Sequence, residues 1–168
     1  SFLIYAHELL DYHGVKTLVR TGTCGALSEG VPLRGVVISS AVRAEGAISG
    51  QVFGLYRPAG PEQARHALAL QRAADLGIAC SAGLTVCSDV FHHPDGRARF
   101  DEPRALGALA VDMETSALYR ISAHFGARAL SLLTVVDHVV TDEQTAYSER
   151  QALFTDMTRL ALEVATGR

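Results

Sequence analysis

The feature that most constrains this chain is the way helical and strand-like patterns alternate along it. Apolar residues recur at helical spacing in residues 2–13, 61–76 and 114–125, and each segment is followed by a glycine that can end a helix. Apolar runs of strand length lie between and after them, at residues 15–20, 35–41, 84–87, 108–113 and 129–136. A chain in which helices and strands alternate is predicted to adopt an α/β fold.

The starts of two helices can also be predicted. Pro61 suits the first position of its helix, where its missing N–H costs nothing. The last helix is expected to begin between residues 142 and 148. Thr141 and Gln144 have the spacing of a capping box there, which also suits a loop. Helical spacing then predicts its core face as Leu153, Met157, Leu160, Ala161 and Val164.

Composition sets the class of protein. With 168 residues, 48% hydrophobic and 20% charged, the chain is expected to form one globular domain, residues 1–168, with a core of its own. The formal net charge of −3 argues against a general nucleic-acid or membrane surface. No apolar run approaches the ~20 residues of a membrane span. Cys24, Cys80 and Cys87 lack metal-ligand spacing, which favours free thiols and a cytoplasmic location.

Polar residues after strands are candidate ligand contacts, because α/β sheets bind ligands beyond the carboxyl ends of their strands. The first such segment is RTGTCGAL, residues 20–27. Arg20 offers a guanidinium fork for phosphate, Thr23 offers a hydroxyl, and two glycines let the backbone approach a ligand. The same pattern also fits a tight turn after a strand.

The second segment is VDMETSALY, residues 111–119, where a strand gives way to a helix. Asp112 and Glu114 lie two residues apart there, and a carboxylate at this place can accept two hydrogen bonds from a vicinal diol such as ribose. Acids at the start of a helix also fit a simpler role, which is to complement the positive end of its dipole.

The third segment follows the most apolar strand. Burial at its end could raise the pKa of Asp137 and keep a proton available for donation, and Arg150 could fold back onto it. An aspartate that shapes a turn is the alternative, and His138 beside it is expected to be structural. Phe91 offers a surface for stacking before a Pro-Asp-Gly turn. The adjacent His92 and His93 have no distant partner at metal-ligand spacing, so they support a metal site only weakly.

In this order, the segments resemble the bacterial hexameric type of purine nucleoside phosphorylase, within the nucleoside phosphorylase and nucleosidase superfamily. The resemblance runs from about Leu3 to the C-terminus. RTGTCGAL and VDMETSALY fit the wider superfamily, TVVDH indicates purine substrates, and DEQTAYSERQ is the most specific to this type.

The resemblance implies a three-layer α/β/α fold around a central mixed β-sheet, and a homo-oligomer, hexameric in the family. It implies phosphorolysis of purine (deoxy)nucleosides to free base and (deoxy)ribose 1-phosphate, a glycosyl transfer of purine salvage. Inorganic phosphate would be the co-substrate, with no metal or organic cofactor.

The resemblance also implies roles for residues that would bind phosphate and ribose. Arg20 and Thr23 would hold the phosphate. Met113 would pack under the ribose, and Glu114 would bind its 2′ and 3′ hydroxyls.

Further residues would serve the base. Phe91 would stack on the purine, with Val111 and Asp112 flanking it. Asp137 would protonate N7 of the leaving purine, and Arg150 would orient and assist Asp137.

The sequence departs from the family at three site positions and at its N-terminal end. Asp112 stands where the family usually has Glu, His92 replaces an aromatic neighbour of the stacking Phe, and Thr23 replaces Ser. The family's N-terminal strands, which supply further phosphate ligands, have no counterpart, and the chain begins at Ser1 inside an apolar segment. A partial domain with a half-complete phosphate site is therefore expected. Two alternatives stay open: a hydrolytic purine nucleosidase, and a catalytically incomplete fragment that binds nucleosides or assembles with partner subunits.

Overall fold

The computed structural model describes residues 2–46, 60–146, 148 and 154–167. Its helices are α1 (Phe2–Asp11), α3 (Gln63–Asp75), α4 (Asp101–Ala105), α5 (Thr115–His124) and α6 (Thr155–Thr166), with a short 3₁₀ turn, η1 (Ala98–Phe100), before α4. Its strands are β1 (Thr17–Ala26), β2 (Val36–Glu45), β3 (Cys80–Ser88), β4 (Ala110–Asp112) and β5 (Arg128–His138). The predicted α/β class is confirmed.

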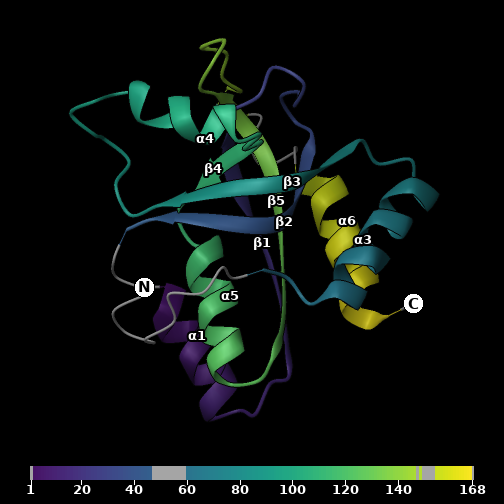
Figure 1. Cartoon of the computed structure of the whole chain (residues 1–168). Helices are drawn as coiled ribbons and strands as arrows, with labels where there is room; N and C mark the ends of the chain where they lie inside the picture. The colour runs from purple at the N-terminus through teal and green to yellow at the C-terminus, as the bar shows by residue number, and fades with distance from the viewer. Residues whose placement is uncertain (1, 47–59, 147, 149–153, 168) are drawn as a thin grey trace.

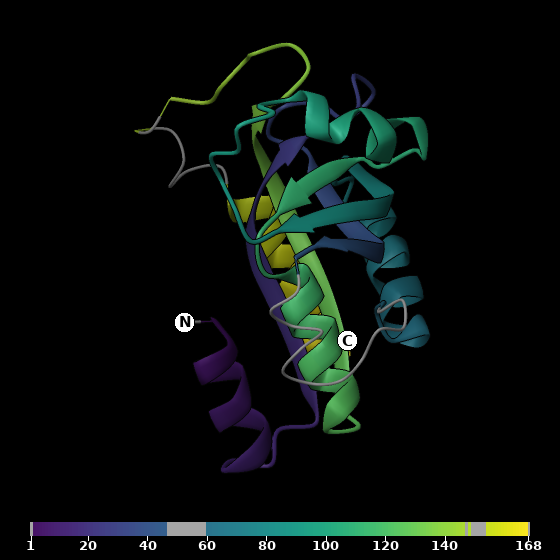
Figure 2. The same ribbon diagram turned by 60° about the vertical axis from the view of Figure 1, so that its left-hand side comes forward.

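The strands form one mixed sheet that closes on itself in the order β1-β4-β3-β2-β5. β1 runs parallel to β5 along its whole length, as β2 does to β3. Antiparallel pairing of β2 with β5 and of the three-residue β4 with β1, together with parallel pairing of β3 with β4, completes the ring. The joint between β1 and β4 consists of two residue pairs, Gly25↔Val111 and Ala26↔Ala110. The predicted mixed sheet is therefore present, curled into a barrel (Figure 2).

Helices cover the sheet on two sides. α1 packs against α5 on one side, and α3 packs against α6 on the other, with the strands between the two pairs (Figure 1). The α3 and α6 side holds the largest core cluster, in which Ile38 and Leu132 of the sheet meet Leu160 and Val164 of α6. Full burial of one such side chain stabilises the fold by roughly 1.5–3 kcal/mol. No described helix is both long and apolar enough to cross a membrane.

The two predicted helix starts are wrong. Pro61 lies outside its helix, because the carboxylate of Glu62 accepts the backbone N–H groups of Ala64 and Arg65 and so caps α3 one residue later. α6 begins at Thr155, not between residues 142 and 148.

The late start of α6 has a local cause. Gln144 forms a bridge with Asp137 at the end of β5, and the Thr145 N–H donates to the carbonyl of Val136 at 2.8 Å. This segment therefore continues the pairing of the sheet. The core face of α6 is as predicted at Met157, Leu160, Ala161 and Val164, which are all buried; Leu153 lies outside the described residues.

Candidate active site

A cavity of about 540 Å³ opens where β1, β4 and β5 end, beside the loop that follows β3. It brings together seven of the nine site residues predicted from the sequence: Thr23, Phe91, Val111, Asp112, Met113, Glu114 and Asp137. Arg20 is not part of the lining but contacts two of these residues. Arg150 lies outside the described residues.

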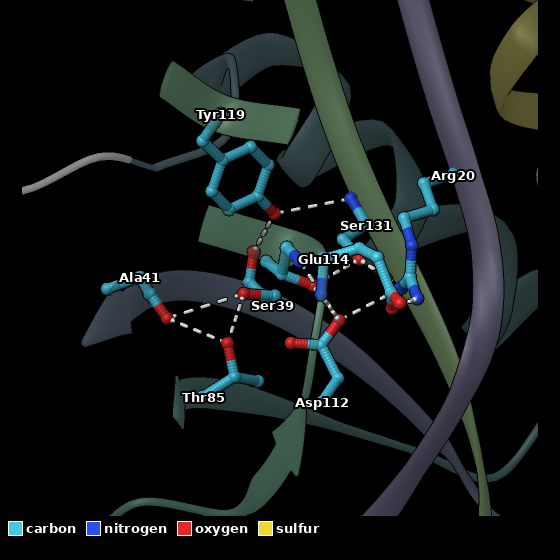
Figure 3. A network of polar contacts seen from close by, with 9 residues as sticks. Arg20, Ser39, Ala41, Thr85, Asp112, Glu114, Tyr119 and Ser131 are labelled. Atoms are coloured by element: carbon cyan, nitrogen blue, oxygen red, sulfur yellow. Dashed lines mark hydrogen bonds and ion pairs between the residues drawn. The ribbon is translucent and has the colours of Figure 1, made fainter. Parts of the chain in front are cut away.

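Arg20 lies between two carboxylates. Its Nη1 is 3.0 Å from Oδ2 of Asp112, and its Nη2 is 2.5 Å from Oε2 of Glu114. Ser131, its register partner on β5, accepts a third contact from Nη1 at 3.4 Å. The Arg20 side chain is only 11% exposed, and its guanidinium points toward Glu114 and Ser131 and not into solvent (Figure 3).

The two glycines of RTGTCGAL make room for side chains of the site. A Cβ at Gly22 would lie 2.6 Å from the Arg20 guanidinium, and a Cβ at Gly25 would lie 2.8 Å from Oδ2 of Asp137. The tight-turn alternative is wrong, because β1 continues to Ala26, with a register shift between Cys24 and Gly25. The pattern therefore marked close approach of side chains within the protein itself.

Asp112 fulfils the simpler of its two proposed roles. Its Oδ2 accepts the backbone N–H groups of Glu114 at 3.3 Å and Thr115 at 3.0 Å, at the start of α5. The Thr115 hydroxyl donates to the same oxygen at 2.7 Å. Burial raises the pKa of Asp112, while the charge of Arg20 and these hydrogen bonds oppose the rise.

Behind Asp112 lies a buried polar network that the sequence analysis missed. The Tyr119 hydroxyl donates to the carbonyl of Ser39 at 2.8 Å and accepts the backbone N–H of Ser131 at 3.2 Å (Figure 3). The Ser131 and Thr115 hydroxyls lie 2.8 Å apart. Burial raises the pKa of Tyr119 to about 12, so its hydroxyl keeps its proton. A signal was available, since Ser131 interrupts the otherwise apolar start of its strand.

Asp137 lies at the far end of β5, opposite Gly25 of β1. The thiol of Cys24 is buried near it, and burial together with the charges of Asp112 and Asp137 raises the pKa of Cys24 well above its ordinary value. The next residue, His138, is structural as expected, because its Nδ1 accepts the backbone N–H groups of Val140 and Thr141.

The loop after β3 presents Phe91 to the cavity with 73% of its surface exposed. The ring of His92 lies edge-on to it, with 5.0 Å between ring centroids. Arg99 anchors this loop, because its Nη1 donates to Ser88 Oγ at 3.2 Å and to the Val90 carbonyl at 2.9 Å.

Two arginines of the lining were not predicted. Arg99 and Arg97 both reach the cavity, and Arg97 forms an ion pair with Asp142 from the segment after β5. His93 makes a local contact instead, because its Nδ1 accepts the backbone N–H of Asp95 within the same turn. In the part of the chain that the structure describes, no group of three or more His, Cys, Asp or Glu residues could hold a metal ion.

Comparison with known proteins agrees with this architecture. The sequence profile of the phosphorylase superfamily matches residues 1–167. A "Purine nucleoside phosphorylase DeoD-type" of Geobacillus kaustophilus (strain HTA426) is 39% identical over 172 residues, covering 98% of this chain and 70% of the relative. A protein of the same name in Caldanaerobacter subterraneus subsp. tengcongensis is 38% identical, and the match covers 98% of this chain and 71% of the relative. Another, in Actinobacillus pleuropneumoniae serotype 5b, is also 38% identical, and the match covers 97% of this chain and 68% of the relative.

A profile match over nearly the whole chain and relatives of this identity and coverage establish the family. The chain therefore belongs to the phosphorylase superfamily.

Proposed function

We propose that this chain catalyses the phosphorolysis of purine nucleosides to a free purine base and ribose 1-phosphate, with deoxynucleosides as further substrates. The observation that carries the proposal is the cavity where β1, β4 and β5 end. It joins an exposed aromatic ring, a half-buried carboxylate and an acid at the end of β5, and the Arg20 guanidinium contacts two carboxylates of its lining. The relatives at 37–39% identity carry the name of this activity.

Phosphate and ribose would bind at the β1 and α5 side of the cavity. Arg20 and Thr23 would hold the phosphate, since a guanidinium fork and a hydroxyl suit its oxygens. Glu114, whose side chain is 38% exposed, would accept hydrogen bonds from the 2′ and 3′ hydroxyls, and Met113 would pack under the sugar.

The purine would bind between the loop after β3 and the end of β5. Phe91 would stack on it and Val111 would lie at its flank, while Asp112 would lie near the base without presenting an oxygen to it. Asp137 would donate a proton to N7, with Arg150 assisting.

In this reaction, the charges that develop on the sugar and on the base lie next to groups that can stabilise them. A phosphate oxygen attacks C1′ while the C1′–N9 bond breaks and its electron pair passes to the base. Positive character develops on the sugar and negative charge on the purine, so phosphate at C1′ and an acid at N7 both stabilise the transition state. Phosphate is the only co-substrate that this scheme requires. That the chain forms a homo-oligomer stays a prediction.

The test is release of hypoxanthine from inosine, followed with and without inorganic phosphate. The proposal expects release that depends strictly on phosphate, with ribose 1-phosphate formed in equal amount. Release of base and free ribose in phosphate-free buffer would show a hydrolytic nucleosidase instead. Inosine binding in a calorimeter without any turnover would show a catalytically incomplete chain.

A further inference from the structure

The side chain of Asp112 has no exposed surface, although the residue borders the cavity. Three hydrogen-bond donors and one ion-pair partner converge on its Oδ2: the N–H groups of Glu114 and Thr115, the Thr115 hydroxyl, and Arg20 Nη1. Within the described residues its Oδ1 is buried and has no hydrogen-bond partner. Neither oxygen is therefore presented to a ligand in the cavity.

This arrangement differs from a contact with the base. A group that binds a purine must offer an accessible donor or acceptor, whereas Oδ2 is saturated by the protein and Oδ1 is covered. Asp112 instead joins two parts of the phosphate and ribose site. Through Nη1 it fixes the guanidinium of Arg20, and through the backbone of residues 114 and 115 it fixes the start of α5, from which Glu114 projects.

We propose that Asp112 is a positioning residue for phosphate, acting through Arg20, and that it does not contact the purine. This rests on the proposed function only in taking Arg20 as the phosphate ligand. The ion pair holds Nη1 in place, so the guanidinium meets phosphate already oriented and loses little rotamer freedom on binding.

The network behind Asp112 supports the same assignment. Ser131 contacts Arg20 Nη1 and the Thr115 hydroxyl, and Thr115 in turn donates to Asp112. The cation is thus held by Ser131 of β5, and the carboxylate by the start of α5 (Figure 3). Moving Asp112 would break two buried hydrogen bonds from Thr115. Unsatisfied buried polar groups are costly, which makes such a network rigid.

The experiment measures phosphate and inosine binding separately by calorimetry, so it does not depend on turnover. Asp112→Asn keeps the shape of the side chain and removes its charge. We expect the Kd for phosphate to rise about tenfold, the scale of a charge-assisted contact. The Kd for inosine, and the ratio of inosine to adenosine affinity, should stay within about twofold, a small effect on this scale. A change in the purine affinities with phosphate binding unchanged would overturn the inference.

A double-mutant cycle tests whether Asp112 acts through Arg20. In an Arg20→Ala background, adding Asp112→Asn should change the remaining phosphate affinity by less than about twofold, because the group being positioned is gone. If Asp112→Asn lowers the phosphate affinity by the same factor with and without Arg20, the inference is contradicted. It is also contradicted if the unsubstituted chain binds no phosphate. If the variants change the phosphate affinity as expected but the chain releases no hypoxanthine, the proposed function is wrong and this inference still holds.

Two further variants keep the test decisive. Glu102→Gln is the matched control, because Glu102 is also a carboxylate paired with an arginine, Arg43, but lies on the surface with 72% exposure. It should leave both affinities unchanged. If Asp112→Asn fails to fold, Thr115→Val removes one donor that aims the carboxylate while keeping side-chain shape. It should weaken phosphate binding in the same direction by about threefold, because the carboxylate keeps its other partners and loses only one hydrogen bond. An unchanged phosphate Kd would then refute the inference.

Discussion

Arg20 faces two carboxylates that differ sharply in exposure. The Asp112 side chain is fully covered, while that of Glu114 is 38% exposed. Moving Asp112 would break buried hydrogen bonds, whereas Glu114 can turn toward solvent or a ligand at small cost. Asp112 is therefore the covered partner of Arg20, and Glu114 is the partner with exposed surface.

Asp137 is expected to matter most for purines that leave poorly. Replacing it with alanine removes the proton donor at N7, and general acid catalysis typically contributes about 10²–10⁴-fold. We expect kcat to fall by about 10²-fold or more with adenosine and by less with inosine, since a 6-amino purine depends more on that proton. Steady-state kinetics with both substrates at saturating phosphate measure the difference. Equal losses on the two nucleosides would show that Asp137 is not the acid at N7.

Individual residues were predictable where their type alone suggested a ligand. Glu114 and Phe91 lie at the cavity as the motifs indicated. The covered state of Asp112 could not be predicted, because it depends on Arg20 from a strand more than 90 positions away and on Ser131 from another. A carboxylate that binds ligand and one that anchors a guanidinium have the same sequence signature.

At the scale of elements, β1 shows how pairing overrides local preference. Glycines at positions 22 and 25 favour a turn, yet parallel pairing with β5, which resumes after a register shift between Cys24 and Gly25, keeps the segment extended to Ala26. Because side chains two apart on a strand share a face, Gly22 leaves the space that the Arg20 guanidinium occupies.

Gly22→Ala should therefore displace the Arg20 side chain while leaving the backbone of β1 in place. The new Cβ would lie 2.6 Å from the guanidinium, which must move away from its carboxylate partners, while the backbone conformation stays available to alanine. We expect the KM for phosphate to rise about tenfold, equivalent to about 1.4 kcal/mol of binding free energy. Urea unfolding should also show a loss of about 1–3 kcal/mol, because the buried carboxylate of Asp112 loses its ion-pair partner.

Gly30→Ala is the matched control, since a Cβ at Gly30 meets only the Ser28 hydroxyl, at an ordinary 3.8 Å. It should leave the KM for phosphate unchanged. A Gly22 variant that also keeps the parent KM would show that the close approach at Arg20 has no consequence for phosphate.

Helix ends were predictable from the sequence where a glycine closes the helix. Gly14, Gly77 and Gly126 all have φ between +63° and +65°, the left-handed conformation that favours glycine after a helix. The start of α6 was not predictable, because the hydrogen bond from the Thr141 hydroxyl goes to Glu143 inside a loop, and Gln144 is paired with Asp137. A capping-box spacing cannot show whether the residues that follow are held by a strand.

At the scale of the whole molecule, the alternation of elements correctly predicted an α/β protein with a mixed sheet. The ring order was beyond reach, because it depends on pairings such as Ala26↔Ala110 between residues far apart in the chain. Strand propensity says nothing about which strands become neighbours, and β4 is only three residues long.

The short β4 has a mechanical consequence for the whole barrel. β1 and β5 are joined along their full length, but β4 holds to β1 by two residue pairs and to β3 by three, Thr85↔Ala110, Val86↔Val111 and Cys87↔Asp112. This seam is the place where the barrel is expected to open first, because local opening follows the least-paired backbone.

Native-state hydrogen exchange can test the seam. The amides of β4 should exchange faster than those in the middle of β5, and equal protection of the two strands would contradict the idea. Since β4 runs directly into residues 112–114, any ligand seated there would bridge both sides of the seam. A bound ligand would then stabilise the closed barrel. It should slow hydrogen exchange at the amides of β4 and raise the melting temperature of the whole chain.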